Sequence, residues 1–240
     1  MQTTVPQRQL KSRRAWVMEH RFSVLLCALV VVIFAAPIVS VVRERTPTLF
    51  SRVLVLACFS LMLLSALFAI SRSRHQLIAA ALLSVPSVIL LSVNAVQGND
   101  HVRAWGYVLT ILFLGYTIFL IVAALFRQRT ITGDIICASL CAYLLLGMFW
   151  AHIYSLTEIL LPGSFSRELN VSGAQSGYAF YHSFVTLSTL GYGDVTPLNP
   201  IARVFSYSEA IAGQIYLAVL VARLVGLHIS QTLIGKEAEQ

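Results

Sequence analysis

Six runs of predominantly apolar residues constrain the fold more than any other feature of the sequence. They cover residues 24–42, 53–70, 77–96, 104–126, 135–161 and 201–222. A helix needs roughly 20 such residues to cross the hydrocarbon of a bilayer, which is about 30 Å thick. Only 11% of all residues are charged, whereas an ordinary soluble domain has about 25%. We therefore predict an all-α membrane protein with six transmembrane helices.

The distribution of Lys and Arg predicts how these helices are oriented. If the N-terminus lies inside, the cytoplasmic loops hold more basic residues than the outer loops, as the positive-inside rule requires. Arg43 and Arg45, which this orientation places outside, go against the rule. We expect both termini in the cytoplasm and lipids around the helices. The net charge of +7 is spread thinly through apolar sequence, so nucleic-acid binding is not expected.

The connection between the last two runs contains a segment that is neither a span nor an ordinary loop. It opens with a Gly/Ser-rich stretch at 162–177 and continues with the apolar and aromatic segment 178–188. That segment is too short to cross a membrane and too apolar for a free loop. A non-helical or half-crossing segment is tolerated at membrane depth where it is buried in protein or lines a water-filled path. We predict a re-entrant half-helix followed by a loop.

The loop after the half-helix has the chemistry to coordinate a bare cation. Gly191 and Gly193 permit backbone conformations that are closed to other residues, so successive carbonyl groups can face the same side. Thr189 adds a hydroxyl oxygen at the inner end of that row. A column of carbonyl oxygens, repeated around an axis, replaces the hydration shell of a potassium ion.

The run from Thr189 to Asp194 resembles, without a gap, the filter of the potassium-channel pore family, whose pattern is Thr-Val/Leu-Gly-Tyr-Gly-Asp. The resemblance covers roughly residues 134–230, and Gly213 stands where voltage-gated relatives place a hinge in the inner helix. It implies passive, K⁺-selective conduction by a homotetramer in a cell membrane, for which we expect a bacterial inner membrane. No organic cofactor is expected. The residues that would coordinate K⁺ are Thr189, Leu190, Gly191, Tyr192 and Gly193.

This chain departs from the family at positions that support the filter. Many members have two tryptophans in the half-helix where this chain has Tyr181 and His182. Some bacterial channels have a glutamate that pairs with the filter aspartate, and this chain has Val185 at that position. Asp194 therefore needs another partner, for which Tyr181 is the candidate.

Glu209 is the one acidic residue deep in a predicted span. An ionisable group there is a functional candidate by default. It could enrich cations near the cavity, or form a hydrogen bond behind the filter, for instance to Thr186 or Ser188. A structural acid that faces the half-helix is an equal alternative, and the sequence does not decide among these three.

The sequence divides into four predicted units. Residues 1–22 form a basic cytoplasmic segment, 23–129 a four-helix unit similar to a voltage sensor, 130–230 the pore domain and 231–240 a short cytoplasmic tail. Voltage sensors carry an arginine at every third position of their fourth span, whereas the run 104–126 contains no basic residue. We therefore expect weak voltage dependence. The gating stimulus and any regulatory partner are not indicated.

Two other functions stay open at this point. One is a channel that discriminates poorly among monovalent cations, although relatives of that type usually lose the tyrosine or the second glycine that this chain keeps at Tyr192 and Gly193. The other is a component of a potassium carrier, which no second filter-like loop supports. The chain has no Gly-x-Ser-x-Gly or His-Glu-x-x-His motif and no paired acids within a span, so an enzyme is not expected.

Overall fold

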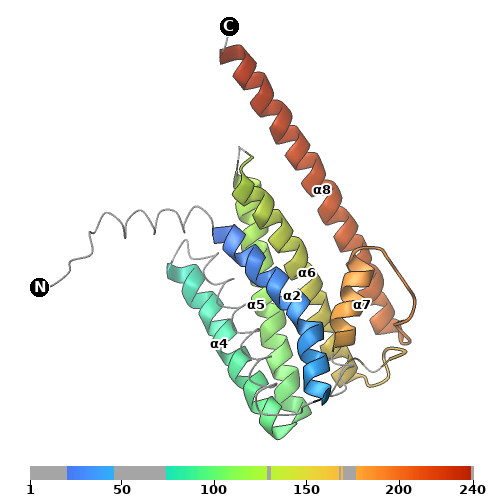
Figure 1. The fold of residues 1–240 in the computed structure, drawn as a ribbon. Coiled ribbons are helices and arrows are strands. Elements are labelled where there is room, and N and C mark those ends of the chain that lie inside the picture. The colour runs from blue at the N-terminus through green and yellow to red at the C-terminus, as the bar shows by residue number, and fades with distance from the viewer. Residues whose placement is uncertain (1–20, 46–73, 129–130, 168, 170–176, 239–240) are drawn as a thin grey trace, which may run out of the picture.

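The computed structural model describes residues 21–45, 74–128, 131–167, 169 and 177–238. Within these ranges every regular secondary-structure element is a helix, and the only β-type pairing is one isolated bridge. The helices, shown in Figure 1, are α2 (Arg21–Arg45), α4 (Arg74–Gln97), α5 (Asp100–Arg127), α6 (Gly133–Leu160), α7 (Tyr178–Leu187) and α8 (Pro200–Ala238).

Four of these helices are long and apolar enough to cross a membrane. The qualifying segments are Arg74–Asn94, Asp100–Arg127, Gly133–Leu160 and Pro200–Ile229. They overlap four of the six predicted runs almost completely, and α2, which is apolar over Phe22–Ala35, contains the first. The predicted run at 53–70 lies outside the described residues. The prediction of an all-helical membrane protein is confirmed, and the count of six spans stays a prediction.

Polar residues next to the apolar runs set where two of the long helices begin. The side chain of Asn99 accepts the backbone N–H of His101 at the start of α5. The side chain of Thr132 accepts the backbone N–H of Ile135 at the start of α6. Such caps satisfy amide groups that have no partner within the helix and are worth about 1 kcal/mol each.

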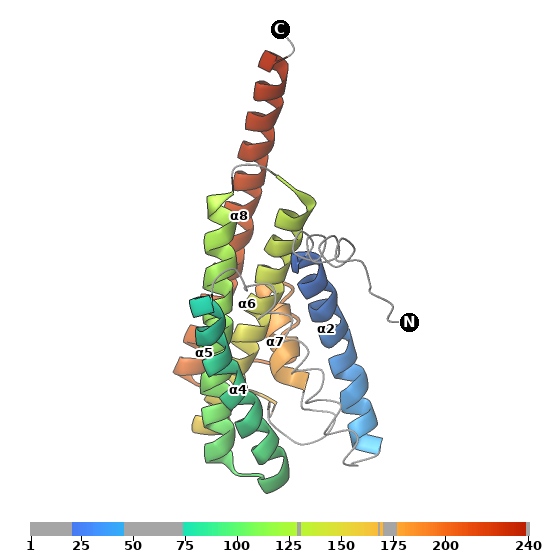
Figure 2. The same ribbon diagram turned by 90° about the vertical axis from the view of Figure 1, so that its left-hand side faces the viewer.

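The core lies where α2, α5 and α6 meet. Helix α5 packs against both α4 and α6, while α2 packs on α6 from another side, as Figure 2 shows. The centre of this core is a set of fully buried apolar side chains: Leu25, Leu29, Phe113, Leu114, Leu145 and Met148. Helix α7 is short and lies beside α6 and α8 (Figure 1).

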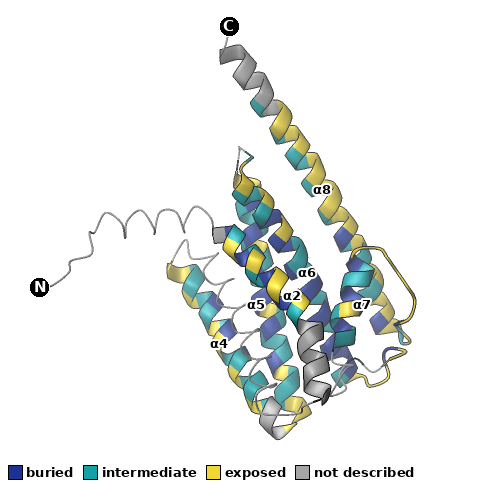
Figure 3. Ribbon diagram, in the orientation of Figure 1, coloured by how far each residue is buried: buried dark blue, intermediate teal, exposed yellow. Residues whose placement is uncertain are grey.

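Helix α8 differs from the others in how much apolar surface it leaves uncovered. It runs for 39 residues, and its C-terminal part projects away from the remaining helices in Figure 1. Residues 231–238, which belong to the predicted cytoplasmic tail 231–240, are helical and continue α8. Figure 3 shows exposed residues along most of its length. The exposed apolar side chains are Ile201, Val204, Tyr207, Ile211, Ile215, Leu217, Val219, Val221, Val225 and Ile229.

Candidate functional site

The short helix α7 packs closely against α6 and α8 at two glycines. A Cβ atom placed on Gly147 of α6 would lie 2.6 Å from Cε1 of Phe184 in α7. A Cβ atom on Gly213 of α8 would lie 2.9 Å from the backbone oxygen of Leu187, the last residue of α7. Both glycines therefore let α7 approach more closely than any larger residue would allow. The Leu187 oxygen also accepts the hydroxyl group of Tyr143 at 3.2 Å.

A buried carboxyl group joins the three helices behind α7. Glu209 of α8 is completely buried, and the hydroxyl group of Tyr154 in α6 donates to its Oε2. Its Oε1 lies 2.5 Å from Oγ of Ser183 in α7. The same Ser183 Oγ donates to the backbone oxygen of Gly147 at 2.7 Å. Glu209 therefore faces the middle of α7 and is satisfied there.

The partners of Glu209 differ from the two that the sequence suggested. Ser188 lies past the end of α7, where its hydroxyl group donates to the Phe184 oxygen at 2.7 Å. The groups that Glu209 does contact, Ser183 and Tyr154, were not singled out in the sequence. Of the three interpretations of Glu209, these contacts favour the structural acid that faces the half-helix.

The backbone after α7 has φ angles of alternating sign. Thr189, Gly191 and Gly193 have φ values of +60°, +59° and +75°, whereas Leu190 and Tyr192 between them do not have positive φ. A positive φ is uncommon for a residue with a side chain and costs of order 1–3 kcal/mol. The backbone N–H groups of Leu190 and Gly191 both donate to the Val185 oxygen, at 2.9 and 3.3 Å.

This segment is exposed in the isolated chain. The side chain of Leu190 is 54% exposed and that of Tyr192 is 65% exposed. Most of the Tyr192 side chain therefore has no packing partner within one chain. The five predicted coordinating residues are consecutive, so the structure places them together, and what they bind stays a prediction.

The predicted filter-support residues of α7 contact Asp194 and the neighbouring helices. The Tyr181 hydroxyl group forms a hydrogen bond with the Asp194 carboxylate, and this bond raises the pKa of Tyr181 above its ordinary value. His182 is buried, with Nε2 3.3 Å from Oγ of Ser206 and its ring 4.9 Å from that of Tyr154. Val185, at the position of the family's glutamate, contributes a backbone oxygen to the turn instead of a carboxylate.

The loop before α7 is tied to the chain that follows the filter-like run. Phe165 and Pro197 form an isolated antiparallel bridge, and the Ser166 N–H donates to the Thr196 oxygen at 2.8 Å. The Arg167 Nε donates to the Asp194 oxygen at 3.3 Å. These contacts were not predicted, since a Gly/Ser-rich stretch carries no pattern that pairs it with a particular distant segment.

Glu158 anchors the same loop to the end of α6. It is 7% exposed, and its two carboxylate oxygens accept the backbone N–H groups of Gly163 at 2.9 Å and Ser164 at 3.1 Å. A carboxylate that accepts two amide hydrogens is well satisfied without a counter-ion. Glu158 therefore stabilises the turn that leaves α6.

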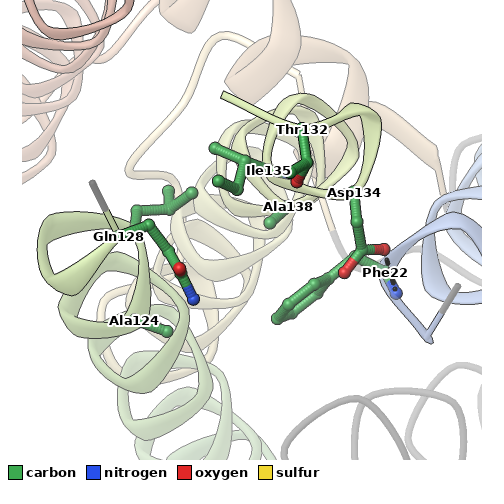
Figure 4. Close-up of a pocket in the computed structure, with 8 residues that line it drawn as sticks. Phe22, Ala124, Gln128, Thr132, Asp134, Ile135 and Ala138 are labelled. Carbon is green, nitrogen blue, oxygen red and sulfur yellow. Dashed lines mark hydrogen bonds between the residues drawn. The ribbon is translucent and has the colours of Figure 1, made fainter. Parts of the chain in front are cut away.

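At the ends of the long helices that lie away from α7, a second set of contacts joins α2 to α6 and α8 to α5. Figure 4 shows a small pocket there, where the Phe22 N–H at the start of α2 donates to Oδ1 of Asp134 in the first turn of α6 at 3.2 Å. Nearby, Nη2 of Arg223 in α8 donates to the backbone oxygens of Leu125 and Gln128, each at 2.7 Å. Arg223 thus adds donors to carbonyl groups at the end of α5, of which the Leu125 oxygen also accepts the Gln128 N–H at 3.3 Å.

A match to a known family covers most of α6, all of α7 and most of α8. Residues 138–228 match a family described as "Ion channel". "Two pore potassium channel c" from Oryza sativa subsp. japonica is 36% identical over 87 residues, which are 36% of this chain and 17% of that protein. "Voltage-gated potassium channel Kch" from Escherichia coli (strain K12) is 42% identical over 48 residues, 20% of this chain and 12% of that protein. The matches therefore span less than a fifth of either relative's length. No solved structure matches the chain significantly.

Proposed function

We propose that this chain, whose residues 138–228 belong to the potassium-channel pore family, conducts K⁺ passively and selectively across a membrane. As a member of a channel family the protein is not an enzyme. The observation that carries the proposal is the run from Thr189 to Gly193, which follows a short helix held between two long apolar helices.

The backbone of this run suits cation coordination. When residues of opposite handedness alternate, their carbonyl groups face the same side instead of spiralling around the chain. The alternating φ signs at 189–193 support such a row of oxygens, with Thr189, Leu190, Gly191, Tyr192 and Gly193 as the K⁺ ligands. Helix α7 adds the partial negative charge of its C-terminal end, which favours a cation beside it.

A ring of oxygens around the ion needs several copies of the chain. One run of carbonyls covers only one side of an ion, so the proposed unit is a homotetramer with the ion path on its fourfold axis. The exposure of Leu190 and Tyr192 and the uncovered apolar surface of α8 support this assembly, because lipid and neighbouring subunits together would cover them. In this arrangement α7 is a re-entrant pore helix, and Asp194, Tyr181, His182 and the Val185 backbone support the filter.

The remaining features of the proposal concern the membrane. We infer six spans, including the run at 53–70, with both termini in the cytoplasm of a bacterial cell. The unit 23–129 would surround the pore domain 130–230 and contact lipid or a partner. Gating at the inner helix would use Gly213 as its pivot.

Ion flux from purified protein in liposomes tests this proposal, with K⁺ and Na⁺ compared. Gly191→Ala places a Cβ on a residue with φ +59°, so it should abolish K⁺ flux. Gly98→Ala is the matched control, because Gly98 has φ +66° and open space around it but lies in the turn between α4 and α5. Each change introduces about the same backbone strain, roughly 1–2 kcal/mol. Equal flux from both variants, or equal K⁺ and Na⁺ flux from the parent protein, would contradict the assignment.

A further inference from the structure

If Glu209 were ionised, the hydrogen-bond contacts around it would need one more hydrogen than the groups at the site carry. Three consecutive oxygen–oxygen contacts run through the site: Tyr154 to Glu209, Glu209 to Ser183, and Ser183 to the backbone oxygen of Gly147. Each contact needs a hydrogen between its oxygens. Tyr154 and Ser183 carry one each, and the Gly147 oxygen carries none. With Glu209 ionised, two hydrogens would serve three contacts.

Sharing one hydrogen does not remove this deficit. Ser183 Oγ lies 2.5 Å from Glu209 and 2.7 Å from Gly147, and both distances are at or below the usual length of an O–H···O bond. If Ser183 donates to Glu209, its Oγ meets the Gly147 oxygen with no hydrogen between them. If Ser183 donates to Gly147, its Oγ meets the Glu209 carboxylate oxygen with no hydrogen between them, unless the carboxyl group of Glu209 supplies one.

We propose that Glu209 retains its carboxyl hydrogen and acts as a neutral positioning residue, donating to Ser183 while it accepts from Tyr154. Each group in this bridge then donates a hydrogen bond to the next: Tyr154 of α6 to Glu209 of α8, Glu209 to Ser183 of α7, and Ser183 to the Gly147 oxygen of α6. Every oxygen in it is satisfied, and no charge is buried among the helices. The bridge itself is a property of the folded chain. Its effect on conduction, through the seating of α7, depends on the proposed channel function.

The site has surroundings that fit a neutral group. Within the described residues the structure places no lysine or arginine side chain in contact with Glu209, and its bonded partners are two hydroxyl groups. Among titratable side chains, Tyr154 of α6 contacts Glu209, Tyr143 of α6 interacts with it electrostatically, and His182 of α7 packs on the Tyr154 ring. An isolated ionised carboxylate in such a place is far more costly to bury than a neutral carboxyl group.

Glutamine is the substitution that tests the proposal, because its amide imitates a neutral carboxyl group. The amide NH₂ can donate to Ser183 and the amide oxygen can accept from Tyr154. Glu209→Gln should therefore melt within about 2 °C of the parent protein, whereas Glu209→Ala, which leaves the partners of the acid unpaired, should melt several degrees lower. Glu158 supplies the matched control, since both of its oxygens accept backbone N–H groups. In Glu158→Gln an NH₂ group would face an N–H donor, so this variant should lose stability where Glu209→Gln does not.

Infrared difference spectroscopy measures the hydrogen directly. The parent protein at neutral pH should show the C=O stretch of a protonated carboxylic acid, and Glu209→Gln should lose that band while Glu158→Gln keeps it. Absence of the band from the parent, or a loss of stability in Glu209→Gln as large as in Glu209→Ala, would overturn the proposal. These measurements need no ion flux. A band that is present in a protein without K⁺ flux would uphold the neutral bridge and contradict the proposed function instead.

Discussion

Replacing Gly213 with alanine tests how tightly the proposed ion path is coupled to the packing of α7. The new Cβ would lie 2.8 Å from Cδ1 and 2.9 Å from the backbone oxygen of Leu187, and ordinary contact begins at 3.4 Å. The leucine side chain can rotate away. The oxygen cannot, because it belongs to the last turn of α7 and accepts the hydroxyl group of Tyr143. Either α8 or the end of α7 must therefore move by about half an ångström.

The expected cost follows from two opposing terms. Overpacking of this kind destabilises by about 1–3 kcal/mol, and alanine in place of glycine stabilises a helix by about 1 kcal/mol. Gly226 lies on the same helix with no atom within 4 Å of its hypothetical Cβ, so Gly226→Ala retains only the favourable term. The two variants should differ by about 1–3 kcal/mol per chain. For a chain of this size that difference corresponds to roughly 2–12 °C in Tm.

Thermal unfolding of the two variants in the same detergent provides the measurement, and single-channel recording adds the functional readout. Gly213→Ala should unfold at the lower temperature. In the proposed channel it should change open probability more than unitary conductance, because it alters both the proposed pivot and the packing of α7. If Gly213→Ala unfolded at or above the temperature of Gly226→Ala, the close approach of α8 to Leu187 would not make a side chain at position 213 destabilising. The packing argument would then be refuted.

Three further outcomes follow from the proposed function. Tyr192→Asp should raise Na⁺ permeability relative to K⁺ in liposomes, since it removes the aromatic ring beside the coordinating carbonyls; unchanged selectivity would count against the filter. Crosslinking or native mass measurement should give a tetramer, and flux from a protein that is only monomeric or dimeric would contradict the ring. The conductance–voltage curve should be shallow, because the interior of α5 over 104–126 carries no basic residue, and each charge moved through 100 mV supplies about 2.3 kcal/mol. A steep sigmoid would refute that last expectation.

The long helices could be predicted from the sequence to within a few residues, since length and hydropathy alone determine where an apolar segment can cross a bilayer. The predicted run 135–161 became Gly133–Leu160, and 104–126 became Asp100–Arg127. Helix α7 was also predictable, because the segment 178–188 is too short for a span and too apolar for a loop. The C-terminal limit of α8 was not, since polar residues beyond the hydrocarbon can extend a helix without changing its hydropathy signal.

Contacts between the helices could not be predicted in the same way. Which side chains meet depends on how each helix is rotated about its axis, and an almost uniformly apolar helix gives little indication of that rotation. Ser183 and Tyr154 therefore went unrecognised as partners of Glu209. Gly147 did carry a signal, since small residues mark close helix packing in membranes, but one glycine does not identify the residue that packs on it.

Gly147 of α6, together with Gly213 and Glu209 of α8, contacts the short helix α7, so that α7 is held between α6 and α8. Gly147 admits the ring of Phe184, Gly213 admits the oxygen of Leu187, and Glu209 contacts Ser183, one turn before that oxygen. Helix α7 is thus held along its second half, directly before the backbone of alternating φ at 189–193. A displacement of α8 relative to α6 must act on at least one of these contacts before it reaches the filter-like run. If the proposed function holds, we therefore expect substitutions on the facing sides of α6 and α8 to alter ion selectivity even though they change none of the proposed K⁺ ligands.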